Sequence, residues 1–190
     1  MKHIAIWASG GGSNADVILS YFKNVMDCKI IYLGCNRKDA GAFDVAKKHN
    51  IEGLYMDKAS WNADQILKQL EVLKIDFIVL AGFLKLVPKE VVTQYQGKII
   101  NIHPSLLPRY GGKNMYGDHV HKAVIENQEI ISGITIHEVN EEFDQGKLLA
   151  QYTLIRDKLD TLENLKAQIQ QLEHTHFASI IHSWIQSKSV

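Results

Sequence analysis

Short apolar runs alternate with longer segments of helical periodicity over the first half of the chain. The runs lie at 3–8, 29–34, 53–56, 77–80 and 98–102, and the helical segments between them include one in which Val17, Ile18, Tyr21 and Phe22 recur. Four repeats of strand and helix, closed by a fifth strand, favour parallel pairing with right-handed crossovers. The pattern predicts an α/β fold, a Rossmann-like open, mostly parallel twisted sheet with helices on both faces.

The second half has a different texture. A glycine-rich stretch at 111–117 precedes a predicted helix at 118–127, and predicted strands at 131–139 and 147–155 flank an acidic loop at 140–146. Asp160 opens the last helix, where Asp160 and Glu163 have the spacing of a capping box. Since no repeat or low-complexity linker interrupts the chain, we expect one domain over 1–190.

Charge and targeting signals limit the kinds of binding partner and the compartment that we expect for this chain. The 21 basic residues equal the 21 acidic ones, so no net field attracts nucleic acid or an anionic membrane, and we expect neither as a partner. No apolar run approaches the roughly 20 residues that span a bilayer, and the N-terminus lacks a signal-peptide pattern. We therefore expect a cytoplasmic protein.

The two cysteines lie seven residues apart in one apolar run. If both belong to one strand, alternation places Cys28 and Cys35 on opposite faces of the sheet. This placement argues against a disulfide and predicts reduced, buried thiols.

Two polar side chains leave the end of the fifth predicted strand. Ligands bind outside the carboxyl ends of strands in open α/β sheets, and the period of two puts Asn101 and His103 on one face. The following loop is held by Pro104 and Pro108. Ser105 lies in this loop without a Gly-x-Ser-x-Gly elbow, so we interpret it as part of the scaffold.

An acidic loop supplies a third group. Asp144 follows a predicted strand and is expected at the same rim as Asn101 and His103. These three groups can together transfer an acyl group to an amine. The amide and the imidazole stabilise the developing oxyanion, and the carboxylate accepts the proton of the amine. The alternative is a metal site of His103, His137 and Asp144, because two histidines and a carboxylate form a known ligand set. We favour acyl transfer without a metal.

The glycine loop at 9–14 is a candidate phosphate site. Bare backbone amides at the start of a helix favour anions, and Ser13 and Asn14 add side-chain donors. Gly10, Gly12 and Ala15 also match the loose dinucleotide fingerprint. The second strand, however, ends at Asn36-Arg37 instead of an acidic residue, which disfavours NAD and leaves NADP open. The other interpretation is a tight turn without a ligand.

The apolar stretch at 82–87 follows the fourth strand. Part of it is expected in the core. Apolar side chains beside free backbone groups at the rim of a sheet can also hold a flat heteroaromatic ring.

Five motifs, in order over nearly the whole chain, resemble the folate-dependent formyltransferase family, and in particular its phosphoribosylglycinamide formyltransferase branch. They are Ser-Gly-Gly-Gly-Ser-Asn at 9–14, Leu-Ala-Gly-Phe at 80–83, Asn-Ile-His-Pro-Ser-Leu-Leu-Pro at 101–108, Gly-Ile-Thr-Ile-His at 133–137 and Asp-x-Gly at 144–146. The resemblance implies formyl transfer from 10-formyltetrahydrofolate to glycinamide ribonucleotide by a monomer or homodimer. In this scheme residues 1–100 bind phosphate, and residues 101–190 carry the catalytic and folate-binding groups.

The resemblance also implies roles for individual residues. Asn101, His103 and Asp144 would be catalytic, and no metal would take part. The substrate would be bound by Gly12, Ser13 and Asn14 at its phosphate and by Glu173 at its ribose. The folate pocket would be lined by Leu84, Lys85, Leu86, Val87, Val139, Asn140 and Glu141.

Three alternatives differ in sequence features. Methionyl-tRNA formyltransferases carry a C-terminal RNA-binding domain, whereas this chain ends soon after its last predicted helix. Formyltetrahydrofolate deformylases usually have an N-terminal regulatory domain and a second histidine where this chain has Pro104. A non-catalytic NADP or nucleotide module would use only the glycine loop. Other family members carry an arginine before the third helix, whereas residues 57–64 of this chain contain none. The contacts to the glutamate tail of the folate are therefore expected to differ from those of other members.

Overall fold

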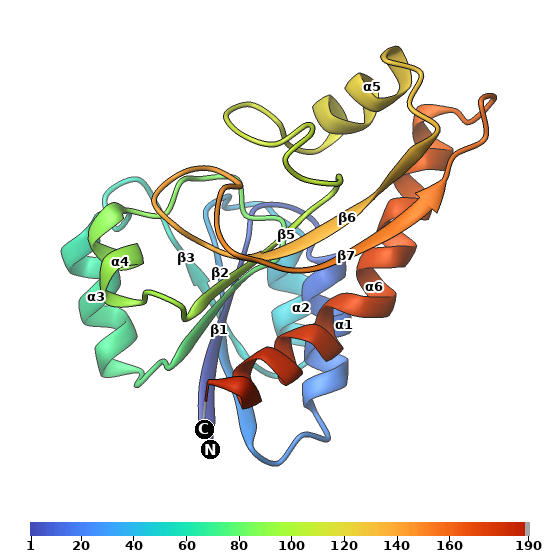
Figure 1. Cartoon of the computed structure of the whole chain (residues 1–190). Coiled ribbons are helices and arrows are strands. Elements are labelled where there is room, and N and C mark those ends of the chain that lie inside the picture. Colours follow the sequence, from blue (N-terminus) through green and yellow to red (C-terminus); the bar gives the residue numbers. More distant parts are fainter. Residues whose placement is uncertain (189–190) are drawn as a thin grey trace.

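The computed structural model describes residues 1–188, which form a seven-stranded sheet in the order β3-β2-β1-β4-β5-β6-β7 (Figure 1). The strands from β3 to β5 run parallel, and β6 and β7 are antiparallel additions at one edge. Their bounds are β1 Lys2–Ala8, β2 Cys28–Cys35, β3 Glu52–Tyr55, β4 Phe77–Leu80, β5 Ile99–His103, β6 Ile131–Glu138 and β7 Leu148–Ile155. The predicted α/β fold, with a mostly parallel open sheet, is confirmed.

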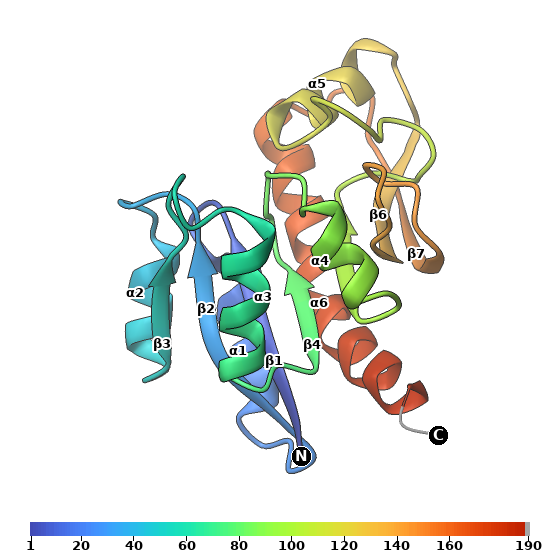
Figure 2. The same ribbon diagram turned by 90° about the vertical axis from the view of Figure 1, so that its left-hand side faces the viewer.

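Helices cover both faces of this sheet (Figure 2). Helices α1 Ser13–Phe22, α2 Ala42–Lys48, α5 Asp118–Glu126 and α6 Leu162–Ser187 contribute to one hydrophobic core, for example through Ile18 and Ile169. Helices α3 Ala63–Val72 and α4 Lys89–Gln94 contribute to a second core on the opposite face, through Leu70 and Val91. None of the helices within residues 1–188 is both long and apolar enough to span a membrane.

The last helix begins differently from the prediction. Its N-cap is Thr161, whose side chain accepts a hydrogen bond from the backbone N–H of Asn164 at 3.2 Å. The Asp160 carboxylate instead accepts from the backbone N–H of Asp157 at 3.0 Å. The predicted capping box of Asp160 and Glu163 was wrong, because the preceding turn uses the Asp160 side chain.

The cysteine prediction was partly wrong. Both thiols are free and buried, as expected, but Cys28 and Cys35 belong to the same hydrophobic core. The register between β1 and β2 shifts so that Ile30 pairs with Ile4 while Tyr32 pairs with Ala5. A bulge of this kind inserts one residue and reverses the alternation. The two cysteines therefore face the same side, which period-two counting cannot show.

The strand order places a crevice at the carboxyl edge of the sheet. β2 and β4 flank β1 on opposite sides, so the loops after β1 and β4 leave in different directions, as at the ligand-binding switch point of open α/β sheets. These loops are bonded to each other. The backbone N–H of Ser9 donates to Gly82 O at 3.0 Å, and the backbone N–H of Leu84 donates to the Ser9 hydroxyl at 2.9 Å.

Candidate active site

A cavity of about 820 Å³ opens at this carboxyl edge and collects residues from distant segments. It brings together eleven of the fourteen site residues expected from the sequence: Asn14, Leu84, Lys85, Leu86, Val87, Asn101, His103, Val139, Asn140, Asp144 and Glu173. Gly12, Ser13 and Glu141 do not line it. Their positions beside the cavity are described below.

Asn101 is oriented by its neighbour in the sheet. It pairs with His137 across β5 and β6, and its Nδ2 donates to His137 Nε2 at 3.1 Å. The other ring nitrogen, Nδ1, donates to the backbone oxygen of Glu138 at 2.8 Å. These two bonds together require a neutral His137 with its proton on Nδ1. The second amide N–H of Asn101 is then available to a ligand oxygen in the cavity.

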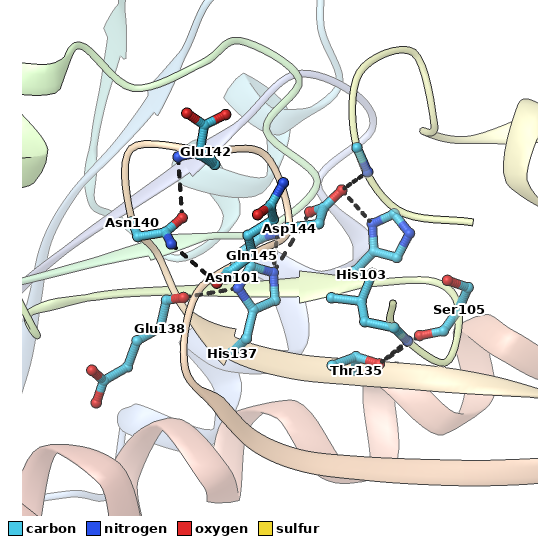
Figure 3. A network of polar contacts seen from close by, with 12 residues as sticks. Asn101, His103, Ser105, Thr135, His137, Glu138, Asn140, Glu142, Asp144 and Gln145 are labelled. Carbon is cyan, nitrogen blue, oxygen red and sulfur yellow. Dashed lines mark hydrogen bonds and ion pairs between the residues drawn. The ribbon is translucent and has the colours of Figure 1, made fainter. Parts of the chain in front are cut away.

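Asp144 lies between two imidazoles (Figure 3). Its Oδ2 is 3.4 Å from His103 Nδ1, and its Oδ1 is 3.6 Å from His137 Nε2. Oδ2 also accepts from the backbone N–H of Gly112 at 2.9 Å. Asp144 has a φ of 56°, a left-handed conformation that aspartate tolerates better than most residues. The backbone of the 140–146 loop thus directs this carboxylate towards β5.

Burial and neighbouring groups set the charges here. Burial opposes ionisation of Asp144, but the adjacent His137 and His103 rings and the hydrogen bond from the Gly112 backbone outweigh it, so the pKa of Asp144 lies below its ordinary value of 3.8. Burial lowers the pKa of His103 below 6.5, although Asp144 and the Tyr110 carbonyl act in the opposite direction. Near neutral pH the site therefore holds an ionised carboxylate beside a neutral imidazole.

The loop after β5 fixes the ring of His103. Its Nε2 donates to the backbone oxygen of Tyr110 at 2.7 Å, and the residue is 4% exposed. The Ser105 hydroxyl donates to Arg109 O at 2.7 Å, while Thr135 Oγ1 donates to Ser105 O at 2.7 Å. Ser105 is thus bonded within the loop, which fits a scaffold and leaves Nδ1 of His103 facing Asp144.

The glycine loop is joined to the last helix. Gly12 has a φ of 81°, and a Cβ there would lie 3.0 Å from Ala42 Cα, so the turn into α1 requires glycine. Ser13 Oγ accepts from Gln170 Nε2 at 3.0 Å, and Asn14 Nδ2 donates to Glu173 Oε2 at 2.8 Å. The predicted phosphate and ribose residues are therefore adjacent across α1 and α6.

Glu173 has an unusual environment for a carboxylate. Burial raises the pKa of Glu173 above 4.5, although the hydrogen bond from Asn14 opposes this change. A buried carboxylate that lines a cavity is a candidate partner for ligand hydroxyl groups. Sequence spacing alone did not single out this residue, which was identified through the resemblance.

The 82–87 segment divides between core and cavity. Val87 is 4% exposed and belongs to the core, whereas Leu84 and Leu86 are 40% and 46% exposed. Lys85 places its Nζ 5.2 Å from the centre of the Trp61 ring. Glu141, outside the cavity lining, forms an ion pair of 2.9 Å with Lys89. The apolar wall of the cavity is thus built from the exposed leucines.

Three further cavity residues were not among the substrate-binding or catalytic residues expected from the sequence. Gln170 and His121 line the cavity, and His137 had been considered only as a metal ligand. The strand pattern at 131–139 contained a partial signal for His137, since it places this residue near a strand end, but its pairing with Asn101 comes from the antiparallel register of β5 and β6. His121 was excluded as a chelate by its spacing from His119, and nothing in the pattern indicated that it would be buried.

A model of the formyl transferase family matches residues 2–181, which include every residue described in the cavity. The chain belongs to the formyl transferase family. Family membership agrees with the motifs at 9–14 and 101–108. The catalytic and binding roles of the individual residues stay predictions.

The chain resembles enzymes of one branch of this family. It is 35% identical to the phosphoribosylglycinamide formyltransferase of Bacillus subtilis, over 95% of this chain and 93% of that protein. It is 38% identical to the chloroplastic phosphoribosylglycinamide formyltransferase of Arabidopsis thaliana, over 95% of this chain. The chain spans 64% of the Arabidopsis protein and 62% of the Vigna unguiculata protein of the same name.

Solved structures agree with the fold. The crystal structure of phosphoribosylglycinamide formyltransferase from Bacillus halodurans superposes with a TM-score of 0.88 and 33% identity, and the match covers 100% of this chain and 97% of that one. The likeness extends through the antiparallel strands as well as the parallel half, because the whole chain is covered.

Proposed function

We propose that this chain transfers the formyl group of 10-formyltetrahydrofolate to the amine of glycinamide ribonucleotide, as one catalytic unit in purine biosynthesis. The observation that carries the proposal is the position of Asp144. Its ionised carboxylate lies beside His103 and His137, in a cavity that runs from the glycine-loop residue Asn14 to the apolar wall at Leu86. The family and the relatives support the same chemistry.

The two substrates are proposed to enter from opposite sides of this cavity. Amides of the glycine loop and the Asn14 side chain bind the ribonucleotide phosphate, since helix N-termini favour anions. Glu173, already bonded to Asn14, accepts hydrogen bonds from ribose hydroxyls. The folate ring system lies against Leu84 and Leu86 and bonds to backbone groups of residues 139–141, at the wall opposite α6.

Formyl transfer is proposed to proceed by direct attack. The substrate amine forms a C–N bond to the formyl carbon, and the electron pair of the carbonyl moves to its oxygen, where the free N–H of Asn101 stabilises the charge. Asp144 accepts the proton released by the amine, directly or through a water molecule. The tetrahedral intermediate collapses as its bond to N10 of the folate breaks, and N10 takes up a proton. The products are formylglycinamide ribonucleotide and tetrahydrofolate.

His103 assists in two ways in this scheme. Its Nε2 proton is held by the Tyr110 carbonyl, so Nδ1 is the atom that faces Asp144 and can share a proton with it. A proton on Nδ1 makes the ring a cation that stabilises the oxyanion. The chemistry requires no nucleophilic side chain and no metal.

The proposed compartment and number of chains follow from the same substrates. Both are small molecules, and we propose a cytoplasmic monomer or homodimer without a nucleic acid partner. Two relatives carry the name chloroplastic, so expression of a tagged chain followed by fractionation is the direct measurement of compartment. Light scattering measures the number of chains.

The decisive experiment is an assay with purified chain, glycinamide ribonucleotide and 10-formyltetrahydrofolate. We expect tetrahydrofolate to appear in proportion to formylated ribonucleotide. Folate deformylation at the same rate without the ribonucleotide would identify a deformylase instead. Thermal stabilisation by NADP, with no response to a folate analogue, would contradict the proposal in favour of a dinucleotide module.

A further inference from the structure

A cluster of three different metal-ligating side chains lies at the end of the sheet opposite the cavity. Among residues 1–188, Asp27, Cys28 and His182 are the group whose ligand atoms all lie within 4.8 Å of one another. Cys28 begins β2, whereas the cavity lies beyond the other ends of β1, β4 and β5. Figure 1 shows the start of β2 and the last turns of α6 at the lower end of the molecule, near the N-terminus.

From this convergence we propose that Asp27, Cys28 and His182 form a binding site for a divalent cation of the Zn²⁺ type. Thiolate, imidazole and carboxylate are the three ligand types that zinc accepts in proteins, and a soft sulfur ligand disfavours Mg²⁺ and Ca²⁺. A water molecule completes the tetrahedron, since the Asp27 side chain is 55% exposed and leaves one side open to solvent.

The histidine is already oriented for this role. His182 Nε2 lies 3.2 Å from Asp27 Oδ1, and its Nδ1 lies 3.3 Å from the hydroxyl of Tyr21. A second ring nitrogen bonded to an oxygen is the usual arrangement around metal-ligating histidines, because it fixes the ring and the tautomer. Tyr21 can accept a hydrogen bond from the Nδ1–H group, and the Nε2 lone pair then binds the cation in place of its contact with Gln186 Nε2 at 3.3 Å.

Cys28 supplies the most selective ligand. Its residue is 3% exposed, and burial raises the pKa of its thiol to about 11, so the thiol is protonated near neutral pH. Binding therefore forms a metal–sulfur bond and releases the S–H proton to solvent. The ammonium group of Met1 and Lys2 act on Cys28 in the opposite sense to Asp27 and favour the thiolate.

The site would connect two parts of the chain. Asp27 and Cys28 lie at the start of β2, and His182 lies on α6, the helix that also carries Glu173. A cation held by both elements binds the folded chain in preference to the unfolded one and so raises its stability. This effect does not depend on formyl transfer, which makes the two proposals separable.

The test is titration of the full chain with Co²⁺ and Zn²⁺. We expect a thiolate-to-Co²⁺ charge-transfer band that saturates at one cation per chain, is displaced by Zn²⁺, and accompanies a rise in Tm. Cys28→Ser should remove the band, and Asp27→Asn should weaken binding. Tyr21→Phe should weaken binding by roughly 10-fold, the lower end of the cost of losing a second-shell partner.

Two matched variants complete the design. His119→Gln changes an exposed histidine elsewhere and Cys35→Ser changes the other buried cysteine, and both should retain the parent affinity. Asp27→Asn lies at an exposed position, so its circular dichroism and melting curve will separate lost binding from misfolding. Absence of the cobalt band in the folded parent, or unchanged affinity in both Cys28→Ser and Asp27→Asn, would overturn the proposal.

Discussion

Nδ1 of His103 lies 3.4 Å from Oδ2 of Asp144, although the two residues are 41 positions apart in the sequence. The distance is longer than a strong hydrogen bond, and a ligand or a proton between the two groups would draw them closer. The carboxylate also accepts from Gly112. The pair therefore connects the end of β5 with the loops that carry Gly112 and Asp144, and the proton transfer that we propose depends on it.

Replacing Asp144 by asparagine should remove the proton acceptor while keeping the shape of the side chain. We expect kcat to fall by about 10²–10⁴-fold, the usual contribution of a general base, with small changes in KM for both substrates. Steady-state kinetics at saturating folate measure the effect. Glu126→Gln, which changes an exposed carboxylate on α5 outside the cavity lining, is the matched control. Turnover near the parent rate in Asp144→Asn would show that another group takes the proton.

His103→Ala should also abolish most formyl transfer. The substitution removes the ring that faces Asp144 and leaves the Tyr110 carbonyl without its donor. We expect a loss of kcat similar to that in Asp144→Asn. The kcat of the double variant should equal that of the less active single variant, because the two groups act as a unit. Additive losses in the double variant would contradict the coupling.

Asn101→Ala tests stabilisation of the oxyanion. Loss of one such donor costs about 10²–10³-fold in kcat, which we expect here with little effect on KM. His137→Gln serves as a companion variant, since His137 orients the Asn101 amide without a proposed contact to the formyl oxygen. We expect a smaller loss of kcat in His137→Gln. The reverse order of the two losses would assign the oxyanion contact to His137.

Asn14→Ala should act on ribonucleotide binding. It removes a donor in the glycine loop and the hydrogen bond to Glu173, so we expect a raised KM for glycinamide ribonucleotide and a nearly unchanged KM for folate. Leu86→Asp should show the opposite pattern, because a charge on the apolar wall opposes binding of the folate ring. Initial rates with each substrate varied in turn measure both. If Asn14→Ala changed only the KM for folate, the assignment of Asn14 to the phosphate site would be contradicted.

His121 should make stability depend on pH. It is 6% exposed, its Nδ1 lacks a hydrogen-bond partner among the described residues, and burial lowers its pKa to about 4. Between pH 6.5 and about 4 the unfolded chain binds this proton and the folded chain does not. His121 therefore leaves the free energy of unfolding unchanged above pH 6.5. As the pH falls towards 4 it lowers this free energy, by at most about 3 kcal/mol.

Urea unfolding of the parent and of His121→Gln between pH 4 and 7 measures this contribution. We expect the difference in unfolding free energy between the two proteins to change over this interval, with the parent losing more on acidification. His119→Gln, an exposed histidine on the same helix, should keep the pH slope of the parent. Equal slopes in the parent and His121→Gln would disprove the effect.

The sequence by itself determined the parallel half of the fold. Four of these strands, β1, β2, β4 and β5, are short apolar runs followed by a turn, and such runs are buried between two layers of helices, whereas the edge strand β3 is mostly exposed. It also determined the Asn101 and His103 pair, because both lie within one strand, where period two fixes the direction of each side chain. Local geometry was sufficient for both.

Tertiary structure decided everything that depends on register or on distant segments. A bulge in β2 brought Cys28 and Cys35 to one face, and antiparallel pairing placed His137 beside Asn101. The conformation of the 140–146 loop directed Asp144 towards His103, and packing of α6 against α1 placed Glu173 next to Asn14. Contacts of this kind depend on how whole elements pack, and residue periodicity records only which face of each element is apolar.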